Sequence, residues 1–215
     1  MDKSTAEKVA KILLRIGAVS LNPQKPYKYS SGILSPVYTD CRLLISHPKE
    51  RRIIRDLYIK RIKSVGKFDI IAGTATAGIP HAAWIAEKMN LPLIYVRGKA
   101  KDHGKGNSIE GSYKKEDKIA VIEDLISTGS SSIDCVLGIR NQKGKSSSIF
   151  SIITYGMKKA KDNFDNNKIK LYPLTDFETV VKIAAKYKYI KNKDIAIILE
   201  WIQDPPSWGK KMGFK

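Results

Sequence analysis

Short apolar segments rich in isoleucine and valine alternate along this chain with longer segments of helical period. The expected strands are residues 68–72, 93–96, 118–122 and 147–154, and the expected helices among them are residues 48–64, 79–89 and 130–141. A helix of ten or more residues between two strands is typical of a parallel crossover, and strands that are apolar throughout are covered on both faces. The pattern therefore predicts an α/β fold around a buried parallel sheet.

Further segments flank this alternating region. We expect a helix over residues 5–17, capped by Thr5 or Ser4, and then irregular strand and loop over 20–46. Beyond residue 156 we expect a strand over 169–172, helices over 175–187 and 192–202, and a packing tail rich in Pro, Trp and Lys. We find neither a linker nor an internal repeat in the 215 residues, so we predict one domain with additions at both ends.

The formal net charge of +18 raises the question of nucleic-acid binding. The densest basic run, residues 49–67, places eight basic residues on one face of an expected amphipathic helix, which favours a solvated surface, although positive potential also suits a polyphosphate substrate. Two cysteines and the lack of a ~20-residue apolar run fit a cytoplasmic protein. We predict no nucleic-acid partner and no membrane association.

The strongest local signal is the segment from Ala120 to Ser132. An apolar strand runs into two adjacent acids, Glu123 and Asp124, and a turn of small hydroxyl residues and glycine then leads into a helix. Backbone N–H groups at such a turn bind anions, and the carboxyl ends of the strands are where ligands bind in open α/β sheets. Because the acids would repel a phosphate, they suit the two hydroxyls of a ribose or a cation. The alternative is a polar strand end followed by an ordinary N-cap.

Two other segments have the composition of phosphate-binding loops. Residues 73–80 contain only small residues between two glycines, so a ligand can approach the backbone closely, although a tight strand-to-helix turn needs the same residues. Residues 97–112 are polar, with four glycines and the cations Arg97, Lys99, Lys101 and Lys105. A long loop of this kind in a compact domain is typically a functional flap, the alternative being a disordered surface loop.

The segment 120–132 resembles the fingerprint of the type I phosphoribosyltransferases, which bind 5-phosphoribosyl-1-diphosphate (PRPP). Three more segments narrow the resemblance to the orotate phosphoribosyltransferases: residues 29–42, 73–81 and 95–111. It implies a parallel-sheet type I phosphoribosyltransferase fold with a small N-terminal hood that covers the substrate and a flexible catalytic loop. The implied divisions are approximately 1–46 for the hood segment, 47–175 for the core with the loop at 97–112, and 176–215 for the C-terminal helices and tail.

The resemblance also implies the reaction and its site. Orotate and PRPP, with Mg²⁺ bound mainly through PRPP, would give orotidine 5′-monophosphate and diphosphate in pyrimidine biosynthesis. The enzyme would be a homodimer in which the loop of one subunit closes over the site of the other. The implied catalytic residues are Lys101, His103 and Asp124. The implied PRPP-binding residues are Arg97, Lys101, His103, Glu123, Asp124, Leu125, Ile126, Ser127, Thr128, Gly129, Ser130 and Ser131, with a diphosphate loop of Thr74, Ala75, Thr76, Ala77 and Gly78.

The partner of the orotate carboxylate stays open, because Gly156 stands where one branch of the family has a substrate arginine. By charge and location we predict Arg42, with Tyr38 and Ser127 as further orotate-binding residues; a structural arginine on a loop is the alternative. Two other functions are weighed: a purine-salvage phosphoribosyltransferase and a non-catalytic regulator that senses PRPP and binds nucleic acid. The retained loop cations and a first helix too short for a winged-helix domain disfavour the regulator.

Overall fold

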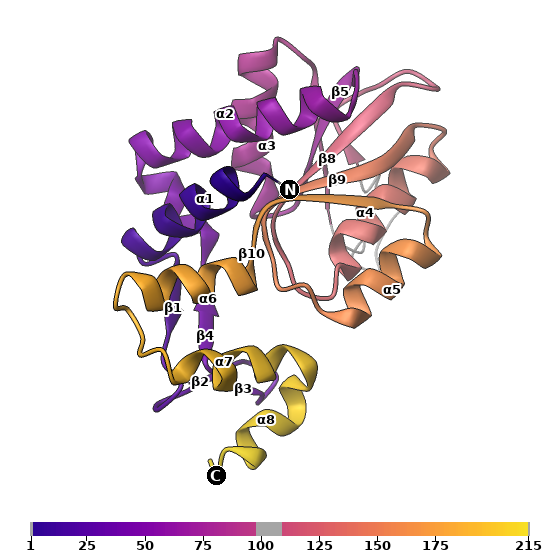
Figure 1. The fold of residues 1–215 in the computed structure, drawn as a ribbon. Coiled ribbons are helices and arrows are strands. Elements are labelled where there is room, and N and C mark those ends of the chain that lie inside the picture. The colour runs from indigo at the N-terminus through magenta and orange to yellow at the C-terminus, as the bar shows by residue number, and fades with distance from the viewer. Residues whose placement is uncertain (1, 98–108, 215) are drawn as a thin grey trace.

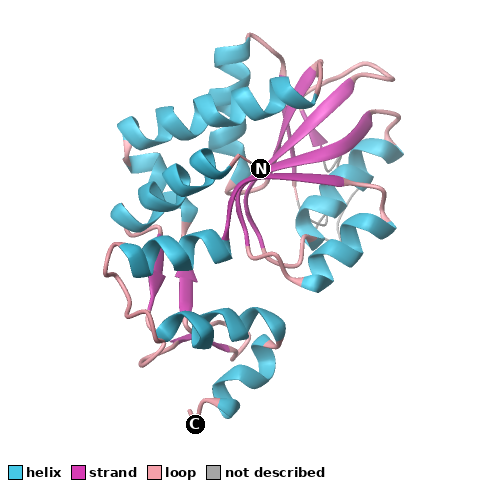
Figure 2. Ribbon diagram, viewed as in Figure 1, coloured by secondary structure: helices cyan, strands magenta, loops and turns pink. Residues whose placement is uncertain are grey.

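The computed structural model describes residues 2–97 and 109–214. Its main sheet has six strands in the order β10-β9-β8-β5-β6-β7 (Figures 1 and 2). These strands are β5 (Ile70–Thr74), β6 (Leu93–Val96), β7 (Ile109–Glu110), β8 (Lys118–Ile126), β9 (Lys145–Thr154) and β10 (Lys170–Asp176). Every pairing is parallel except that of β7 with β6, which confirms the predicted parallel α/β sheet.

Helices cover both faces of this sheet, as Figure 1 shows. One face carries α1 (Lys3–Arg15), α2 (Pro48–Val65), α3 (Gly78–Met89) and α6 (Phe177–Lys186), and the other carries α4 (Ser130–Asn141) and α5 (Lys158–Asn166). Successive residues of β8 alternate between the two cores: Ala120 and Ile122 join the first, Ile119 and Val121 the second. The period-two geometry of a strand therefore explains why this segment is apolar throughout.

A smaller lobe lies at one end of the core, at the bottom of Figure 1. It contains two antiparallel pairs, β1 (Val19–Leu21) with β4 (Val37–Thr39) and β2 (Tyr27–Lys28) with β3 (Leu34–Ser35). The helices α7 (Asp194–Gln203) and α8 (Pro205–Lys211) pack beside them, and the 3-10 helix η1 (Cys41–Ser46) leads back to the core.

The C-terminal tail packs against the hood strands. Trp201 and Trp208 are each 1 % exposed, and the Trp201 indole N–H donates to the Leu34 carbonyl at 3.2 Å. The backbone of Gly209 also lies against the Leu34 side chain. The tail is thus a packed element, as predicted, and it joins the C-terminal helices to the hood strands in the smaller lobe (Figure 1).

Several local expectations were wrong. Asp2, not Thr5 or Ser4, caps α1, because its carboxylate accepts from the N–H groups of both residues. Strand β8 continues through the two acids to Ile126, since Glu123, Leu125 and Ile126 pair in register with β9. Helix α5 was not expected, and its burial of Ala160 and Phe164, four residues apart, is the pattern that would have indicated it.

Candidate functional site

The two predicted phosphate loops meet at the carboxyl edge of the sheet. β5 and β8 are neighbouring parallel strands, so the segments that follow them leave the sheet side by side. Between them lies a cavity of about 300 Å³ lined by Ala75, Thr76, Ala77, Glu123, Asp124, Leu125, Ser127, Thr128, Gly129, Ser130, Ser131 and Ser132. The structure therefore brings together most of the residues that the sequence singled out, although they lie almost fifty positions apart.

At two positions beside the cavity, neighbouring groups lie so close to the backbone that only glycine fits. A Cβ on Gly78 would lie 2.4 Å from the Ile122 carbonyl oxygen, so α3 can begin tight against β8 only with glycine there. Gly129 has φ +79° as the N-cap of α4, and a Cβ there would lie 2.5 Å from the Phe164 ring. The turn of residues 127–131 is thus held from behind by α5, and the Asn163 side-chain amide also donates to the Thr128 carbonyl at 3.1 Å.

The two carboxylates at the cavity differ in accessibility. Glu123 is 7 % exposed, and its oxygens accept from the Asp124 backbone N–H at 3.1 Å and from the Ser132 hydroxyl at 2.8 Å. The Tyr58 hydroxyl donates to the Glu123 backbone carbonyl at 2.6 Å. Asp124 is half-buried. Asp124 is therefore the carboxylate that is more open to a ligand, whereas Glu123 is held within the protein.

Burial changes the protonation of the groups behind the cavity. Burial, with the negative charge of Asp124 as a further cause, raises the pKa of Glu123 to about 8. Burial lowers the pKa of His81 to about 4, so this imidazole is neutral at pH 7, and its Nε2 finds no hydrogen-bond partner among the described residues. His81 instead packs against the rings of Tyr58 and Trp84.

Other predicted site residues lie outside this cavity. Thr74, Gly78 and Ile126 belong to the elements that carry its walls. Arg97 directly follows β6 and pairs with Glu110 of β7 at 2.6 Å, so the described residues on either side of 98–108 lie next to each other at the edge of the sheet. Lys101 and His103 lie outside the described residues.

The predicted orotate residues are divided between two places. Ser127 lines a second cavity, of about 640 Å³, which shares Ser127 and Thr128 with the first. Arg42 lies on η1, where its guanidinium donates twice to Asp40, and the Tyr38 ring packs against Tyr27. Neither Arg42 nor Tyr38 lines either cavity.

Sequence reasoning missed several contributors. Ser132 ends the segment that the sequence singled out but was not among the predicted PRPP-binding residues, and its contact with Glu123 is what gives it a role. Asn163 and Phe164 support the turn from a helix that was not expected. No local signal marks Tyr58, because its partner is 65 residues away in the sequence.

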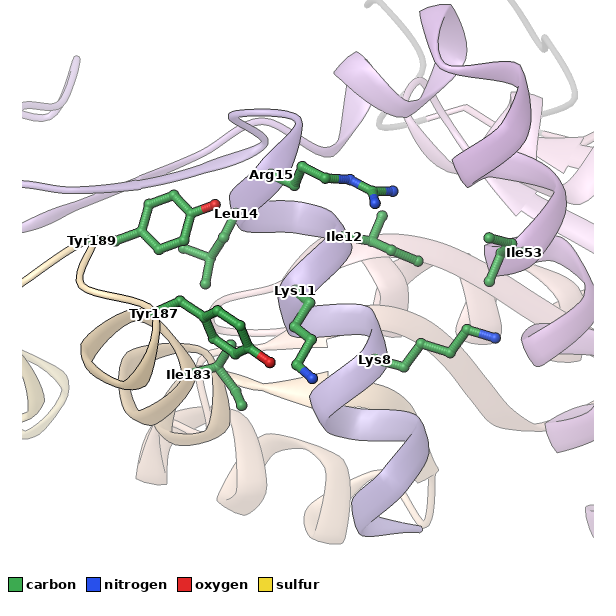
Figure 3. Close-up of a pocket in the computed structure, with 9 residues that line it drawn as sticks. All are labelled: Lys8, Lys11, Ile12, Leu14, Arg15, Ile53, Ile183, Tyr187 and Tyr189. Atoms are coloured by element: carbon green, nitrogen blue, oxygen red, sulfur yellow. The ribbon is translucent and has the colours of Figure 1, made fainter.

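A further cavity, of about 360 Å³, lies between α1, α2 and the end of α6 (Figure 3). The Lys11 ammonium lies 4.9 Å from the centre of the Tyr187 ring, and Arg15 pairs with Glu50. This cavity holds none of the predicted site residues.

In residues 2–97 and 109–214 no group of three or more His, Cys, Asp or Glu side chains could hold a metal ion, and no helix could span a membrane.

Comparison with known proteins agrees with this geometry. Residues 44–187 match the family model of the phosphoribosyl transferase domain. The orotate phosphoribosyltransferase of Listeria innocua is 44 % identical over 208 residues, covering 96 % of this chain and all of the relative. The chain belongs to the orotate phosphoribosyltransferase family.

Two further relatives support this membership. The orotate phosphoribosyltransferase of Coxiella burnetii is 45 % identical, covering 94 % of this chain and 98 % of the relative. The crystal structure of orotate phosphoribosyltransferase from Aeropyrum pernix aligns with a TM-score of 0.74 at 26 % identity, over 85 % of this chain and 99 % of that one. The expected fold and family are thereby confirmed, and the chain is a transferase.

Proposed function

We propose that the protein transfers the 5-phosphoribosyl group of PRPP to orotate, giving orotidine 5′-monophosphate and diphosphate in pyrimidine biosynthesis. The observation that carries the proposal is the convergence of two small-residue turns and a carboxylate pair on one cavity, beside a larger cavity that shares Ser127 and Thr128. The first suits a sugar with phosphates, and the second has room for a heterocycle. Full-length relatives with this activity in their names support the choice of orotate.

The ribose phosphate would be held by the segment that ends β8 and begins α4. Backbone N–H groups and hydroxyls of residues 127–131 would bind the 5-phosphate, and the turn of residues 74–78 would bind the diphosphate. Asp124 would accept from the ribose hydroxyls, and Glu123, held by Ser132, would fix the backbone beside it. The proposal extends to Leu125 and Ile126, which place these groups at the strand end.

Catalysis would depend on positioning and electrostatics. Positive charge develops on the ribose as the bond to diphosphate lengthens, and the carboxylate of Asp124 opposes it. Arg97, Lys101 and His103 would neutralise the departing diphosphate, with Lys101 as the first candidate for proton donor. The pyrimidine nitrogen must then lie in line with the anomeric carbon, which is a matter of orientation in the second cavity.

Magnesium fits this site as an ion bound mainly through the substrate. The described residues provide only the adjacent carboxyl groups of Glu123 and Asp124 at the cavity, with no cluster of three ligands, so further oxygens would come from PRPP and water. When bound, Mg²⁺ supplies positive charge that stabilises the leaving diphosphate.

We also propose a homodimer in the cytoplasm, in which the loop of one subunit completes the site of the other. The exposed apolar side chains of Leu43 and Ile45 on η1, 40 % and 39 % accessible, support a buried partner surface. The two free cysteines, Cys41 and Cys135, are buried, which fits a reducing compartment. The hood segment before residue 47, with α7 and α8, would cover the pyrimidine.

An orotate-consumption assay tests the proposed function. The absorbance of orotate is expected to fall in the presence of PRPP and Mg²⁺, and not when either is left out. Adenine and hypoxanthine, run in parallel, are not expected to react. A failure to consume orotate together with turnover of a purine would indicate the salvage activity, and tight PRPP binding without any turnover would indicate a regulator.

The variant Asp124→Asn tests the proposed role of this carboxylate in catalysis. Removing the charge that opposes the developing cation is expected to lower kcat/KM at least about a hundredfold. The melting temperature is expected to change little, because this side chain is half-buried. Activity close to that of the wild type would contradict the proposed role of Asp124.

A further inference from the structure

The second cavity is rich in positive charge from a single helix. Its lining combines hood residues (Tyr29, Ser31 and Ile33), the Ser127–Thr128 turn, the start of α5 and the segment from Trp201 to Pro206. Lys158, Lys159 and Lys161 are its charged residues, and no acidic side chain is among those that line it. A cavity of this composition favours an anionic ligand.

One of the three lysines shares the helix face that contacts the phosphate turn. The Asn163 amide donates to the Thr128 carbonyl at 3.1 Å, which fixes that face of α5 toward the turn. Lys159 lies four residues before Asn163 and therefore occupies the same face. Because helical side chains lean toward the N-terminus, Lys159 extends from this face toward the wall that the two cavities share.

The other two lysines are oriented differently. Lys158 and Lys161 are three residues apart and share a different face of α5. Lys161 also borders a separate cavity, together with Phe164 and Tyr172. Lys159 makes no ion pair with an acidic side chain of the described chain, so its charge is available to a ligand.

Arg42, the partner predicted from the sequence, is in a poorer position. Its Nε and Nη2 donate to the two Asp40 carboxylate oxygens at 2.7 and 2.9 Å. This pair neutralises the guanidinium, and Arg42 does not line the second cavity. A carboxylate bound in that cavity would therefore meet the ammonium of a lysine first.

We propose that Lys159 binds the carboxylate of the pyrimidine substrate and so selects orotate over bases that lack this charge. The inference rests on the proposed function and adds the residue that makes the second cavity specific. The heterocycle would lie between the hood and α5, next to the Ser127–Thr128 turn, with its charged group at the first turn of the helix. Lys159 therefore binds the substrate and takes no part in the chemical step.

The test compares Lys159→Gln with Lys168→Gln, which removes the same charge from an exposed position just after α5 that lines neither cavity. Lys159→Gln is expected to raise the KM for orotate about tenfold or more, since a hydrogen bond between charged groups is lost. The KM for PRPP and the melting temperature are expected to stay unchanged. Lys159→Arg is expected to recover most of the affinity, and Lys168→Gln to shift the KM for orotate less than about twofold.

A neutral analogue separates charge recognition from cavity shape. The carboxamide of orotate, used as a competitive inhibitor, is expected to show the same inhibition constant with wild type and Lys159→Gln. An unchanged KM for orotate in Lys159→Gln, or an equal rise in Lys168→Gln, would overturn the assignment while leaving the proposed function intact. A wild-type enzyme that consumes no orotate would remove the proposed function itself.

Discussion

The acid pair at the end of β8 is the most unusual feature at the scale of single residues. Two carboxyl groups follow one another in the sequence and line the same cavity, yet Glu123 is buried and hydrogen-bonded within the protein while Asp124 is only half-buried. Alternation along a strand explains the difference, because successive side chains point to opposite faces. The sequence alone therefore predicts two equivalent acids, and the strand geometry makes them differ in burial.

A pH dependence of stability follows from Glu123. Its pKa is raised from 4.5 to about 8 by burial, so the folded state binds more protons than the unfolded state between these values, and stability is lost as pH rises through that window. The buried His81 acts in the opposite sense, but only between about 4 and 6.5. Between pH 6.5 and 8 the ligand-free protein is therefore expected to lose on the order of 1 kcal/mol of unfolding free energy.

Urea unfolding at several pH values checks this expectation with two variants. Glu123→Gln, which resembles the protonated acid, is expected to abolish the decline between pH 6.5 and 8. Glu200→Gln, an exposed acid on α7, is expected to leave it in place. If the wild-type protein were equally stable at both pH values, the buried carboxyl group would not be protonated in the folded state.

At the scale of elements, the phosphate turn depends on a helix that lies behind it. α5 places Phe164 against Gly129 and Asn163 against the Thr128 carbonyl. The shape of the turn is therefore determined by tertiary packing as well as by its own glycine. Interpreting residues 127–131 only as the N-cap of α4 therefore leaves out the contacts with α5 that determine the shape of the turn.

Gly129→Ala is expected to cost more stability than Gly17→Ala. Both glycines have positive φ, +79° and +73°, so both variants pay a similar backbone strain of about 1–2 kcal/mol. Only at Gly129 does the added Cβ meet another group, the buried Phe164 ring at 2.5 Å, whereas nothing lies within 4 Å at Gly17. Overpacking should add about 1–3 kcal/mol, measured by chemical denaturation.

The same pair of variants separates fold from function. Gly129→Ala is also expected to weaken PRPP binding strongly, because the turn must move away from α5. Gly17→Ala is expected to bind PRPP like the wild type. Equal destabilisation by the two substitutions would mean that Phe164 yields freely and does not hold the turn.

At the scale of the whole molecule, the proposed dimer can be tested by mixing two inactive variants. Lys101→Ala removes a loop cation, in a segment outside the described residues, and Asp124→Asn disables the site. If the loop acts in the partner's site, each mixed dimer has one complete site. Random mixing of equal amounts should then restore about a quarter of the wild-type activity.

Each variant alone serves as the control in that experiment, and native mass spectrometry with one variant isotopically labelled confirms that the dimers exchange subunits. Restoration requires the loop and the carboxylate to come from different chains. A mixture no more active than the two variants apart, despite subunit exchange, would show that each loop serves its own site.

Much of this molecule follows from the sequence alone. The apolar strands, the alternating helices and the two small-residue turns are local patterns, and each is determined by the backbone and side-chain preferences of adjacent residues. The order β10-β9-β8-β5-β6-β7 was not predictable in this way, although it is what places the turn after β5 beside the turn after β8. The burial of Glu123, the support of the turn by Phe164 and the position of Lys159 at the second cavity were likewise decided by tertiary structure. The physical reason is that these features depend on contacts between segments far apart in the chain, whose relative placement is settled only when the helices pack on the sheet.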